Sequence, residues 1–271
     1  MPPPGGRAAP RIVVAANPED LARRVADEVC KRLSAAIAER GIAHFVLTGG
    51  SSPLRLYADL RREPWRSSVE WNRVVLWMGD DRYVPSHDAD SNAGVARRLL
   101  FDPDGSPNGP LPVPSDNVRF FPIDEARSRA DGAEWAAYAY SAQISAGVPG
   151  DPPVFDLILL GLGPDGHILS VFPGSAALEA GTPLVLTIPA PTHVEPRLPR
   201  LTLNPVVVPA ARAVMLLSQG GAKAGIVASV LTEPRDPRRL PAQLAAGPNA
   251  TWFLDAAAAS GLDADAFSDG D

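Results

Sequence analysis

The chain has one cysteine, Cys30, among its 271 residues. A lone thiol cannot form an intramolecular disulfide or supply a cysteine-rich zinc site, so both kinds of cross-link are excluded. Cys30 falls at helical spacing with Leu33 and Ile37, which is typical of a small residue buried on a helix face. A hydrophobic core must therefore stabilise the fold, and a chain of this length can bury a large one.

Positively charged residues are also fewer than negatively charged ones. The chain has 25 Lys and Arg residues against 31 Asp and Glu, which gives a formal net charge of −6 at pH 7. Nucleic-acid-binding domains usually carry a basic surface, so we expect no nucleic-acid partner. An anionic ligand would have to be held by a local group of cations and backbone N–H groups.

Long apolar segments are missing as well. No run of 18 apolar residues occurs, and the first ten residues (MPPPGGRAAP) lack the apolar stretch of a signal peptide. We therefore expect a cytoplasmic protein with no membrane contact. Composition predicts disordered tails at residues 1–10 and 261–271, and a single domain over residues 11–260.

Strand and helix signals alternate through this domain. Asn17-Pro18-Glu19-Asp20 predicts a helix start and Gly41 its end. The predicted strands are 12–16, 43–48, 73–78, 118–121, 155–161, 184–188 and 212–217, and the other predicted helices are 53–62, 92–101, 125–145 and 221–232. Several strands are continuously apolar, as in parallel sheets covered on both faces. The predicted fold class is α/β, with a mostly parallel central sheet and helices on both faces.

The segment 47–53 (LTGGSSP) follows one of the predicted strands. Gly49 and Gly50 allow close approach to the backbone, and Ser51 lies at a helix start, where free N–H groups favour a phosphate. A structural turn without a ligand explains the segment equally well. A nucleophilic Ser51 is disfavoured, because Pro53 stands where a G-x-S-x-G elbow needs glycine.

The segment 79–92 (GDDRYVPSHDADSN) follows the next predicted strand. Arg82 can clamp a phosphate through its planar guanidinium, or it can simply neutralise neighbouring acids such as Asp80. Ser91 is predicted to cap the following helix, with Asn92 directly behind it.

The segment 161–174 (GLGPDGHILSVFPG) carries the strongest signal, since G-x-G-x-x-G follows a predicted strand. A dinucleotide site would need an acid near Thr187, where none occurs, and Pro164 removes a backbone donor. What remains is a turn that projects Asp165 and His167 beyond the strand. Histidine ordinarily titrates near neutral pH, and Asp165 could fix its tautomer, so His167 is the candidate general base.

Two further cations complete the candidate site. Arg200 begins a short strand-like stretch, and Lys223 opens a helix. Both could bring positive charge to one cleft, although exposure to solvent is an equally good explanation for Lys223. The remaining histidines are expected outside the site, His44 in the core or at a sheet edge, and His87 and His193 in solvent.

In this order, the segments resemble the 6-phosphogluconolactonase family. The matching motifs are T/S-G-G-S-x-P at 48–53, D-E-R-x-V-P…D-S-N at 80–92, L-G-x-G-x-D-G-H-x-A-S-L-F-P-G at 160–174, R-[IL]-T at 200–202 and G-x-x-K ending at 223. The third motif is highly specific. The similarity extends from about Ile12 to about Asp255.

The resemblance implies a modified Rossmann fold shared with glucosamine-6-phosphate deaminase and ribose-5-phosphate isomerase. It implies hydrolysis of 6-phospho-D-glucono-1,5-lactone in the oxidative pentose-phosphate pathway, without metal or organic cofactor. His167, with Asp165, would activate water, and backbone N–H groups of residues 161–167 would stabilise the oxyanion. The implied substrate- and phosphate-binding residues are Gly49, Gly50, Ser51, Asp80, Arg82, Asn92, Gly163, Arg200 and Lys223. The expected partner is a small sugar-phosphate lactone, and the expected state is a monomer or small homo-oligomer.

The chain departs from the family pattern in three places. Asp81 stands where glutamate is usual, Ile168-Leu169 replaces Thr-Ala, and the loop before Arg200 lacks a lysine followed by prolines, which makes Arg197 an alternative cation.

Two other functions remain open. A glucosamine-6-phosphate deaminase or related isomerase would share the fold, but that family has A-F-N-E-P where this chain has SVFPG. A non-catalytic phosphosugar sensor would usually carry a DNA-binding helix pair, and no basic helical pair flanks this domain.

Overall fold

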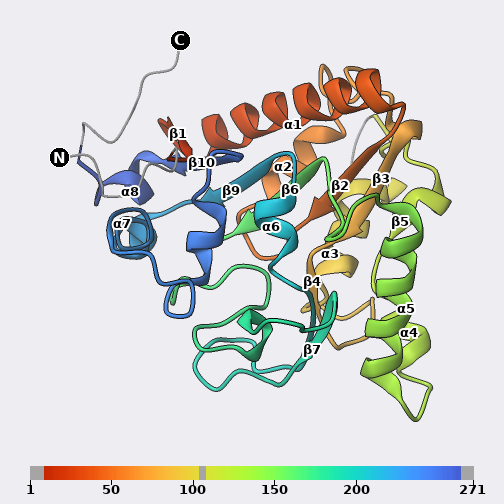
Figure 1. Cartoon of the computed structure of the whole chain (residues 1–271). Coiled ribbons are helices and arrows are strands. Elements are labelled where there is room, and N and C mark those ends of the chain that lie inside the picture. Colours follow the sequence, from red (N-terminus) through yellow and green to blue (C-terminus); the bar gives the residue numbers. More distant parts are fainter. Residues whose placement is uncertain (1–8, 104–107, 264–271) are drawn as a thin grey trace.

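The computed structural model describes residues 9–103 and 108–263 (Figure 1). Most of the two predicted tails, and residues 104–107 within the proline-rich segment 102–116 (DPDGSPNGPLPVPSD), lie outside the described residues. The strands are β1 (Arg11–Ala15), β2 (Ala43–Leu47), β3 (Val74–Met78), β4 (Asp80–Arg82), β5 (Val118–Arg119), β6 (Leu157–Gly161), β7 (Val185–Ile188), β8 (Arg200–Leu203), β9 (Val214–Ser218) and β10 (Ala250–Asp255). The helices are α1 (Pro18–Arg40), α2 (Leu54–Leu60), α3 (Asn92–Phe101), α4 (Ile123–Ala126), α5 (Gly132–Gly147), α6 (Val207–Ala210), α7 (Ala224–Thr232) and α8 (Ala256–Ala259).

The central sheet of the described chain has seven parallel strands in the order β1-β10-β9-β6-β2-β3-β5. Every residue of β2, β3, β9 and β10 is buried. Successive side chains of a strand point to opposite faces, so complete burial requires cover on both faces of the sheet. The predicted α/β fold with a mostly parallel sheet is confirmed.

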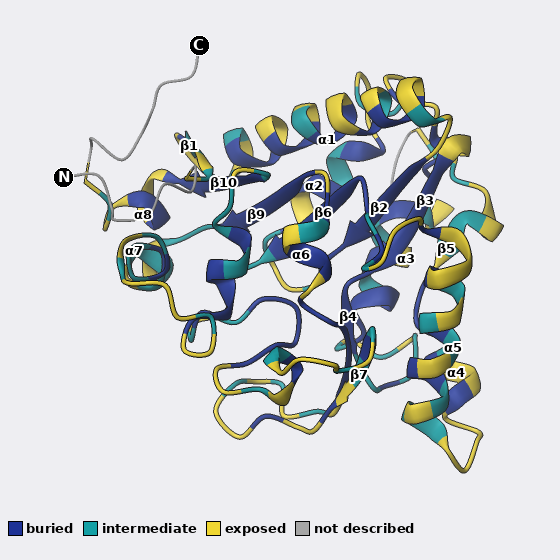
Figure 2. Cartoon of the chain, in the orientation of Figure 1, coloured by how far each residue is buried: buried dark blue, intermediate teal, exposed yellow. Residues whose placement is uncertain are grey.

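Helix α1 forms where its local signals place it. The Asn17 side chain accepts a hydrogen bond from Asp20 N at 2.9 Å, and Gly41, at φ 78°, ends the helix by donating its N–H to Ile37. Figure 2 shows the helix exposed on its outer side and buried where it faces the sheet. The buried apolar residues recur at every fourth position, at Leu21, Val25, Val29, Leu33 and Ile37, with Cys30 beside them.

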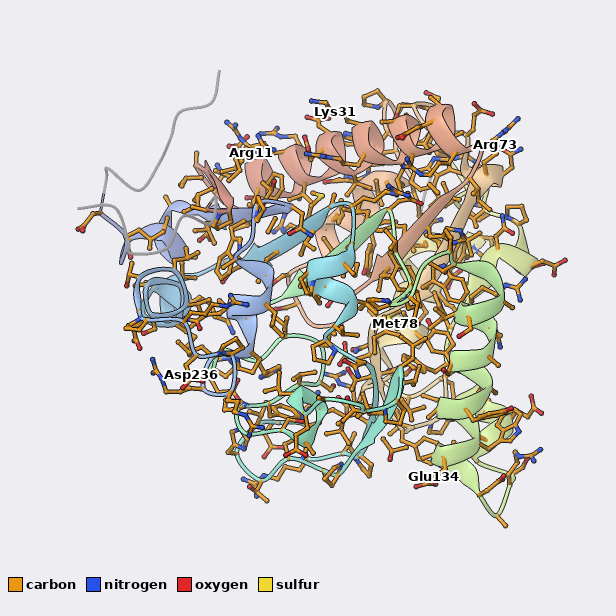
Figure 3. The ribbon with its side chains drawn as sticks, viewed as in Figure 1. Arg11, Lys31, Arg73, Met78, Glu134 and Asp236 are labelled. Atoms are coloured by element: carbon orange, nitrogen blue, oxygen red, sulfur yellow. The ribbon has the colours of Figure 1, made fainter. Side chains whose placement is uncertain are left out.

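The core lies between the sheet and the elements that cover it. In Figure 3, the labelled charged side chains Arg11, Lys31 and Arg73 lie at the periphery, whereas Met78 lies in the middle of the molecule. Met78 ends β3 and is fully buried. None of the helices in the described ranges is long and apolar enough to cross a bilayer.

A second, smaller sheet joins β4, β8 and β7 in antiparallel pairs. The predicted strand at 184–188 therefore forms, as β7, but outside the parallel sheet. Its burial alternates in part, because Leu186 and Thr187 are less buried than Val185 and Ile188, as suits a strand with one covered face. Strand β8 corresponds to the strand-like stretch predicted to begin at Arg200, whereas β4 and β10 have no counterpart in the sequence predictions.

This topology gathers the sequence motifs at one edge. The segments at 47–53, 79–92, 161–174 and 219–223 follow β2, β3, β6 and β9, which are neighbours in the order β9-β6-β2-β3. Ligands of such sheets bind beyond the carboxyl ends of the strands, where these loops meet. The second sheet adds a fifth segment, because β4 pairs with β8 and sets Arg82 opposite Arg200.

Candidate active site

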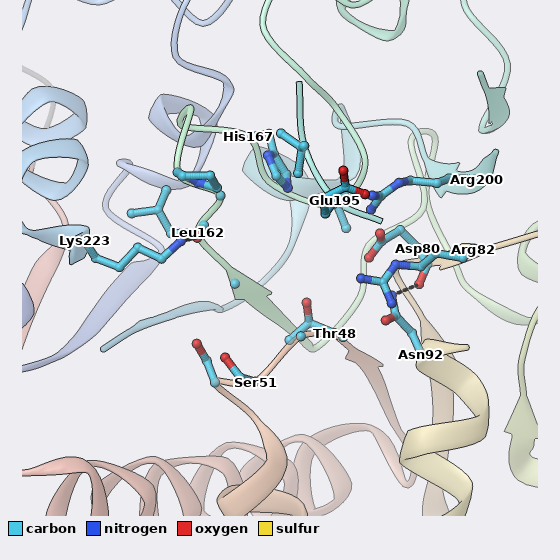
Figure 4. Close-up of a pocket in the computed structure, with 18 residues that line it drawn as sticks. Thr48, Ser51, Asp80, Arg82, Asn92, Leu162, His167, Glu195, Arg200 and Lys223 are labelled. Atoms are coloured by element: carbon cyan, nitrogen blue, oxygen red, sulfur yellow. Dashed lines mark hydrogen bonds between the residues drawn. The ribbon is translucent and has the colours of Figure 1, made fainter. Parts of the chain in front are cut away.

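A pocket lies at this edge of the sheet, and all the motif segments contribute to its wall (Figure 4). The sequence-predicted residues that line it are Gly49, Gly50, Ser51, Asp80, Arg82, Asn92, Gly163, His167, Arg200 and Lys223. Asp165, the remaining candidate, does not line the pocket but is hydrogen-bonded to His167.

His167 is held in one orientation by Asp165. Its Nδ1 lies 2.5 Å from Asp165 Oδ1, and its backbone N–H donates to the same oxygen at 3.2 Å. A carboxylate can only accept, so Nδ1 carries the proton and Nε2 of a neutral ring keeps a free lone pair. Burial acts to raise the pKa of Asp165, but hydrogen bonds and charge from His167, then His193, hold it well below the usual value.

Gly163 makes room for this imidazole. A Cβ atom at position 163 would overlap the His167 ring, so the ring rests directly on the backbone of the loop. The loop closes on itself through hydrogen bonds from Gly163 N to His167 O and from Gly166 N to Gly163 O. The N–H groups of Gly163, Gly166 and His167 are therefore engaged within the loop, so an oxyanion would have to be bound by other backbone N–H groups of residues 161–167.

Asp165 gives a testable pH dependence of stability. Because its pKa is lower in the fold than the ordinary 3.8, the unfolded chain binds more protons on acidification. Its contribution to stability is therefore complete at pH values well above 3.8 and is lost progressively as the pH falls from there towards the lower pKa of the folded state. We expect Asp165→Asn to lose less stability than the wild type between about pH 6 and pH 3, measured by urea unfolding. The exposed Asp116→Asn is the control, and equal acid sensitivity of all three proteins would contradict the prediction.

Two arginines, Arg200 buried and Arg82 partly buried, form one side of the pocket. Arg82 donates from Nη1 to Asp90 O at 2.6 Å, and Arg200 donates from Nη2 to Pro196 O at 2.9 Å. In both guanidinium groups, Nε is buried and has no hydrogen-bond partner in the described part of the chain. Burial lowers the pKa of Arg200, and the nearby Asp80 carboxylate acts against this. A buried donor without a partner is costly, so these groups suit an anionic ligand.

Lys223 reaches the pocket from the other side (Figure 4). It ends a short 3₁₀ turn (Gly221–Lys223) before α7, and its Nζ donates to Leu162 O at 2.7 Å. Arg197, the alternative to Arg200, is exposed, pairs with Glu195 and does not line the pocket. Of these two arginines, the structure brings only Arg200 into the site.

The acids of the 79–92 segment have separate roles. Asp80 lines the pocket and accepts a hydrogen bond from Ser170 Oγ at 2.6 Å. Asp81 instead caps α3, where it accepts hydrogen bonds from the backbone N–H groups of Asn92 and Ala93. Burial raises the pKa of Asp81 to about 6, although these N–H groups act to lower it. Asp81 is therefore structural, although it lies within the motif.

Asn92 connects this segment to the glycine loop. Its Nδ2 donates to Asp80 O at 3.0 Å, and its side chain lies so close to Gly49 that a Cβ there would overlap it. Ser91 caps α3 as predicted, with Oγ accepting from Gly94 N at 2.9 Å. Packing against Asn92 therefore requires glycine at position 49, independently of any ligand in the pocket.

Tyr57 fixes the start of the glycine loop. Its hydroxyl accepts from Thr48 N at 3.1 Å and donates to Thr48 O at 2.7 Å, in a fully buried position. Tyr57→Phe leaves both backbone groups without a partner, so we expect a loss of about 1–3 kcal/mol in the free energy of unfolding. Urea unfolding measures this loss, with Tyr138→Phe, at an exposed tyrosine, as the control. Equal stability of the two variants would show that Thr48 finds other partners.

Sequence reasoning missed two side chains beside His167. His193, expected in solvent, is half exposed, yet its Nε2 lies 2.9 Å from Asp165 Oδ2. Phe172 packs its ring against His167 at 4.7 Å between centroids, and the Arg200 guanidinium lies 5.4 Å from the same ring. No sequence feature indicated this contact directly. The sequence showed only that the loop containing His193 departs from the family pattern.

A parallel α/β sheet with a carboxylate-bound histidine and several cations at its carboxyl edge suits an enzyme that acts on a phosphorylated substrate. The chain belongs to the glucosamine-6-phosphate isomerase/6-phosphogluconolactonase family, whose model matches residues 16–253. No group of three or more potential metal ligands is assembled among the described residues.

Sequence relatives and solved structures of known function agree with this family assignment. A 6-phosphogluconolactonase of Mycobacterium tuberculosis is 37% identical over 233 residues, covering 85% of this chain and 89% of that protein. One from Streptomyces coelicolor is 35% identical over 265 residues, covering 93% and 95%. The solved 6-phosphogluconolactonase of Trypanosoma brucei superposes with a TM-score of 0.81 at 29% identity, covering 95% and 100%. A monomeric glucosamine-6-phosphate deaminase, with a TM-score of 0.74 and 19% identity over 93% of this chain and all of its own, shares the fold.

Proposed function

We propose that this chain hydrolyses 6-phospho-D-glucono-1,5-lactone to 6-phospho-D-gluconate. The observation that carries the proposal is the His167 imidazole, fixed by Asp165 beside a pocket lined with three cations. The relatives named 6-phosphogluconolactonase support the choice of substrate. The proposed setting is the cytoplasm and the oxidative pentose-phosphate pathway, which follows from that substrate.

In the proposed reaction, His167 Nε2 takes a proton from water as the water oxygen bonds to the lactone carbonyl carbon. The bond from that carbon to the ring oxygen then breaks, and the ring oxygen takes the proton back from the imidazolium. Asp165 stabilises the transient imidazolium and keeps its Nδ1–H in place. General-base catalysis of this kind contributes about 10²–10⁴ in rate.

The phosphate is proposed to lie among Arg82, Arg200, Lys223 and the Gly49–Ser51 loop, and Asp80 and Asn92 to face the sugar. Backbone N–H groups of residues 161–167 other than those of Gly163, Gly166 and His167 are proposed to offset the negative charge that develops on the carbonyl oxygen. Binding of the distant phosphate would hold the carbonyl near His167, so that binding energy serves to orient the reacting atoms.

A pH-stat assay on freshly prepared 6-phosphogluconolactone tests the proposal, with spontaneous hydrolysis measured alongside and subtracted. Acid release well above the spontaneous rate supports lactonase activity. Release of ammonia from glucosamine 6-phosphate, with no acceleration of lactone opening, would assign the chain to the deaminase branch instead.

A further inference from the structure

We propose that His193 is a positioning residue for His167 and acts through the carboxylate of Asp165. The inference rests on the proposed function, because it concerns the orientation of the proposed general base. It goes beyond that function by adding a side chain from a loop that departs from the family pattern.

The Asp165 carboxylate is held at both of its oxygens. Oδ1 faces His167 Nδ1 at 2.5 Å, and Oδ2 faces His193 Nε2 at 2.9 Å. A carboxylate fixed at one oxygen can still turn about its Cβ–Cγ bond, whereas two bonded oxygens oppose that rotation. The donor from His193 therefore keeps Oδ1 aligned with His167.

His193 is itself fixed from a second side. Its ring meets Phe172 edge-on at 5.7 Å between centroids, and Phe172 also packs against His167. Val194 and Glu195, which follow His193 directly, line the pocket. The bond from His193 to Asp165 therefore ties this part of the pocket wall to the loop that carries the proposed base.

The charged groups around Asp165 come from four elements. His167 lies on its own loop, His193 on the loop before β8, Arg200 on β8, and Lys223 at the start of α7. Removing the His193 donor leaves the other three in place. The Asp165 carboxylate then accepts one hydrogen bond fewer, so its negative charge is less well stabilised. A proton on the His167–Asp165 pair is therefore released less readily.

Two replacements separate the hydrogen bond from the shape of the ring. His193→Phe keeps an aromatic ring beside Phe172 but removes the donor. His193→Gln provides an amide nitrogen near the position of Nε2 and so keeps a donor. His87→Phe makes the same ring change at an exposed loop histidine outside the pocket and is the matched control.

We expect His193→Phe to lower kcat roughly 3- to 10-fold, the effect of losing one hydrogen bond, with KM nearly unchanged. The acid limb of its kcat/KM profile should move to higher pH, since the His167–Asp165 pair releases its proton less readily. His193→Gln should recover most of the lost kcat, and His87→Phe should match the wild type. A merely structural role for His193 would lower thermal stability without moving the pH profile.

The outcomes distinguish this proposal from the proposed function. A wild type no faster than spontaneous hydrolysis would overturn the function, and long-range ¹H–¹⁵N spectra of the imidazoles would then decide the positioning role. A shift of the His167 ring nitrogens in His193→Phe, absent in His87→Phe, supports it, and unshifted nitrogens overturn it. With an active wild type, an unchanged kcat in His193→Phe overturns it, as does a His193→Gln variant as impaired as His193→Phe.

Discussion

Replacing His167 by alanine is expected to lower kcat for 6-phosphogluconolactone by about 10²–10⁴-fold, the usual contribution of a general base. His167 lines the pocket, and its Nδ1 proton is directed at Asp165, so Nε2 is the basic atom available to an attacking water. The cations that would hold the phosphate are untouched by this change. Binding of 6-phosphogluconate, measured by calorimetry, should therefore remain close to that of the wild type.

Chemical rescue makes this experiment sharper. Alanine leaves a hollow between the Gly163 backbone and Phe172, where the ring now lies, so added imidazole should restore part of the turnover in His167→Ala. His87→Ala is the matched control and should neither lose activity nor respond to imidazole. Turnover in His167→Ala equal to that of the wild type would end the proposed mechanism, even if the chain remained a lactonase.

The predictable part of the fold is the part that local signals encode. Helix α1 could be placed from its cap, its period and its terminal glycine because these features act within one turn of the chain. The strands β2, β3, β6 and β9 could be recognised because both of their faces are buried, which leaves a continuous apolar run.

Strands β4 and β10 were not predicted because their evidence is not local. β10 contains Thr251 and Asp255, whose burial depends on β1 and β9 lying on either side. Asp255 is the buried cap of α8 and also accepts a hydrogen bond from Gly220 N. No pattern within the segment reveals those partners. β4 is three residues long and polar, and it exists because β8 pairs with it.

The residues of the candidate site likewise fall into those that local sequence could identify and those that it could not. Asp165 and His167 could be paired from the sequence because they share one tight turn. His193 lies 28 positions from Asp165, on a loop without regular structure, so nothing local indicates that its ring turns back to the carboxylate. The position of Arg200 depends on strand register, because the pairing of β8 with β4 places it opposite Arg82 in the pocket wall, whereas Arg197 lies outside the pocket.

Replacing Arg200 by alanine is expected to raise KM for the phosphorylated lactone roughly 10- to 100-fold, the effect of losing a hydrogen bond to a charged group. Arg200 is 4% exposed, and its Nε has no partner within the described residues, so it can bind an anion without giving up another bond. Its removal also takes away one positive charge near the Asp80 carboxylate, so that carboxylate would repel a phosphate more strongly. The ratio of kcat/KM for the phosphorylated lactone to that for plain glucono-1,5-lactone should fall by a similar factor.

Arg197→Ala is the matched control, because Arg197 lies on the same stretch of chain but is exposed and paired with Glu195. Loss of that surface pair should change KM by less than about twofold. Arg200→Lys retains the charge without the planar fork and should fall between alanine and the wild type. If Arg200→Ala kept the preference for the phosphorylated lactone while Arg197→Ala lost it, Arg197 would be the phosphate-binding residue. The loop before β8 would then have to rearrange when substrate binds, because in this structure Arg197 does not line the pocket.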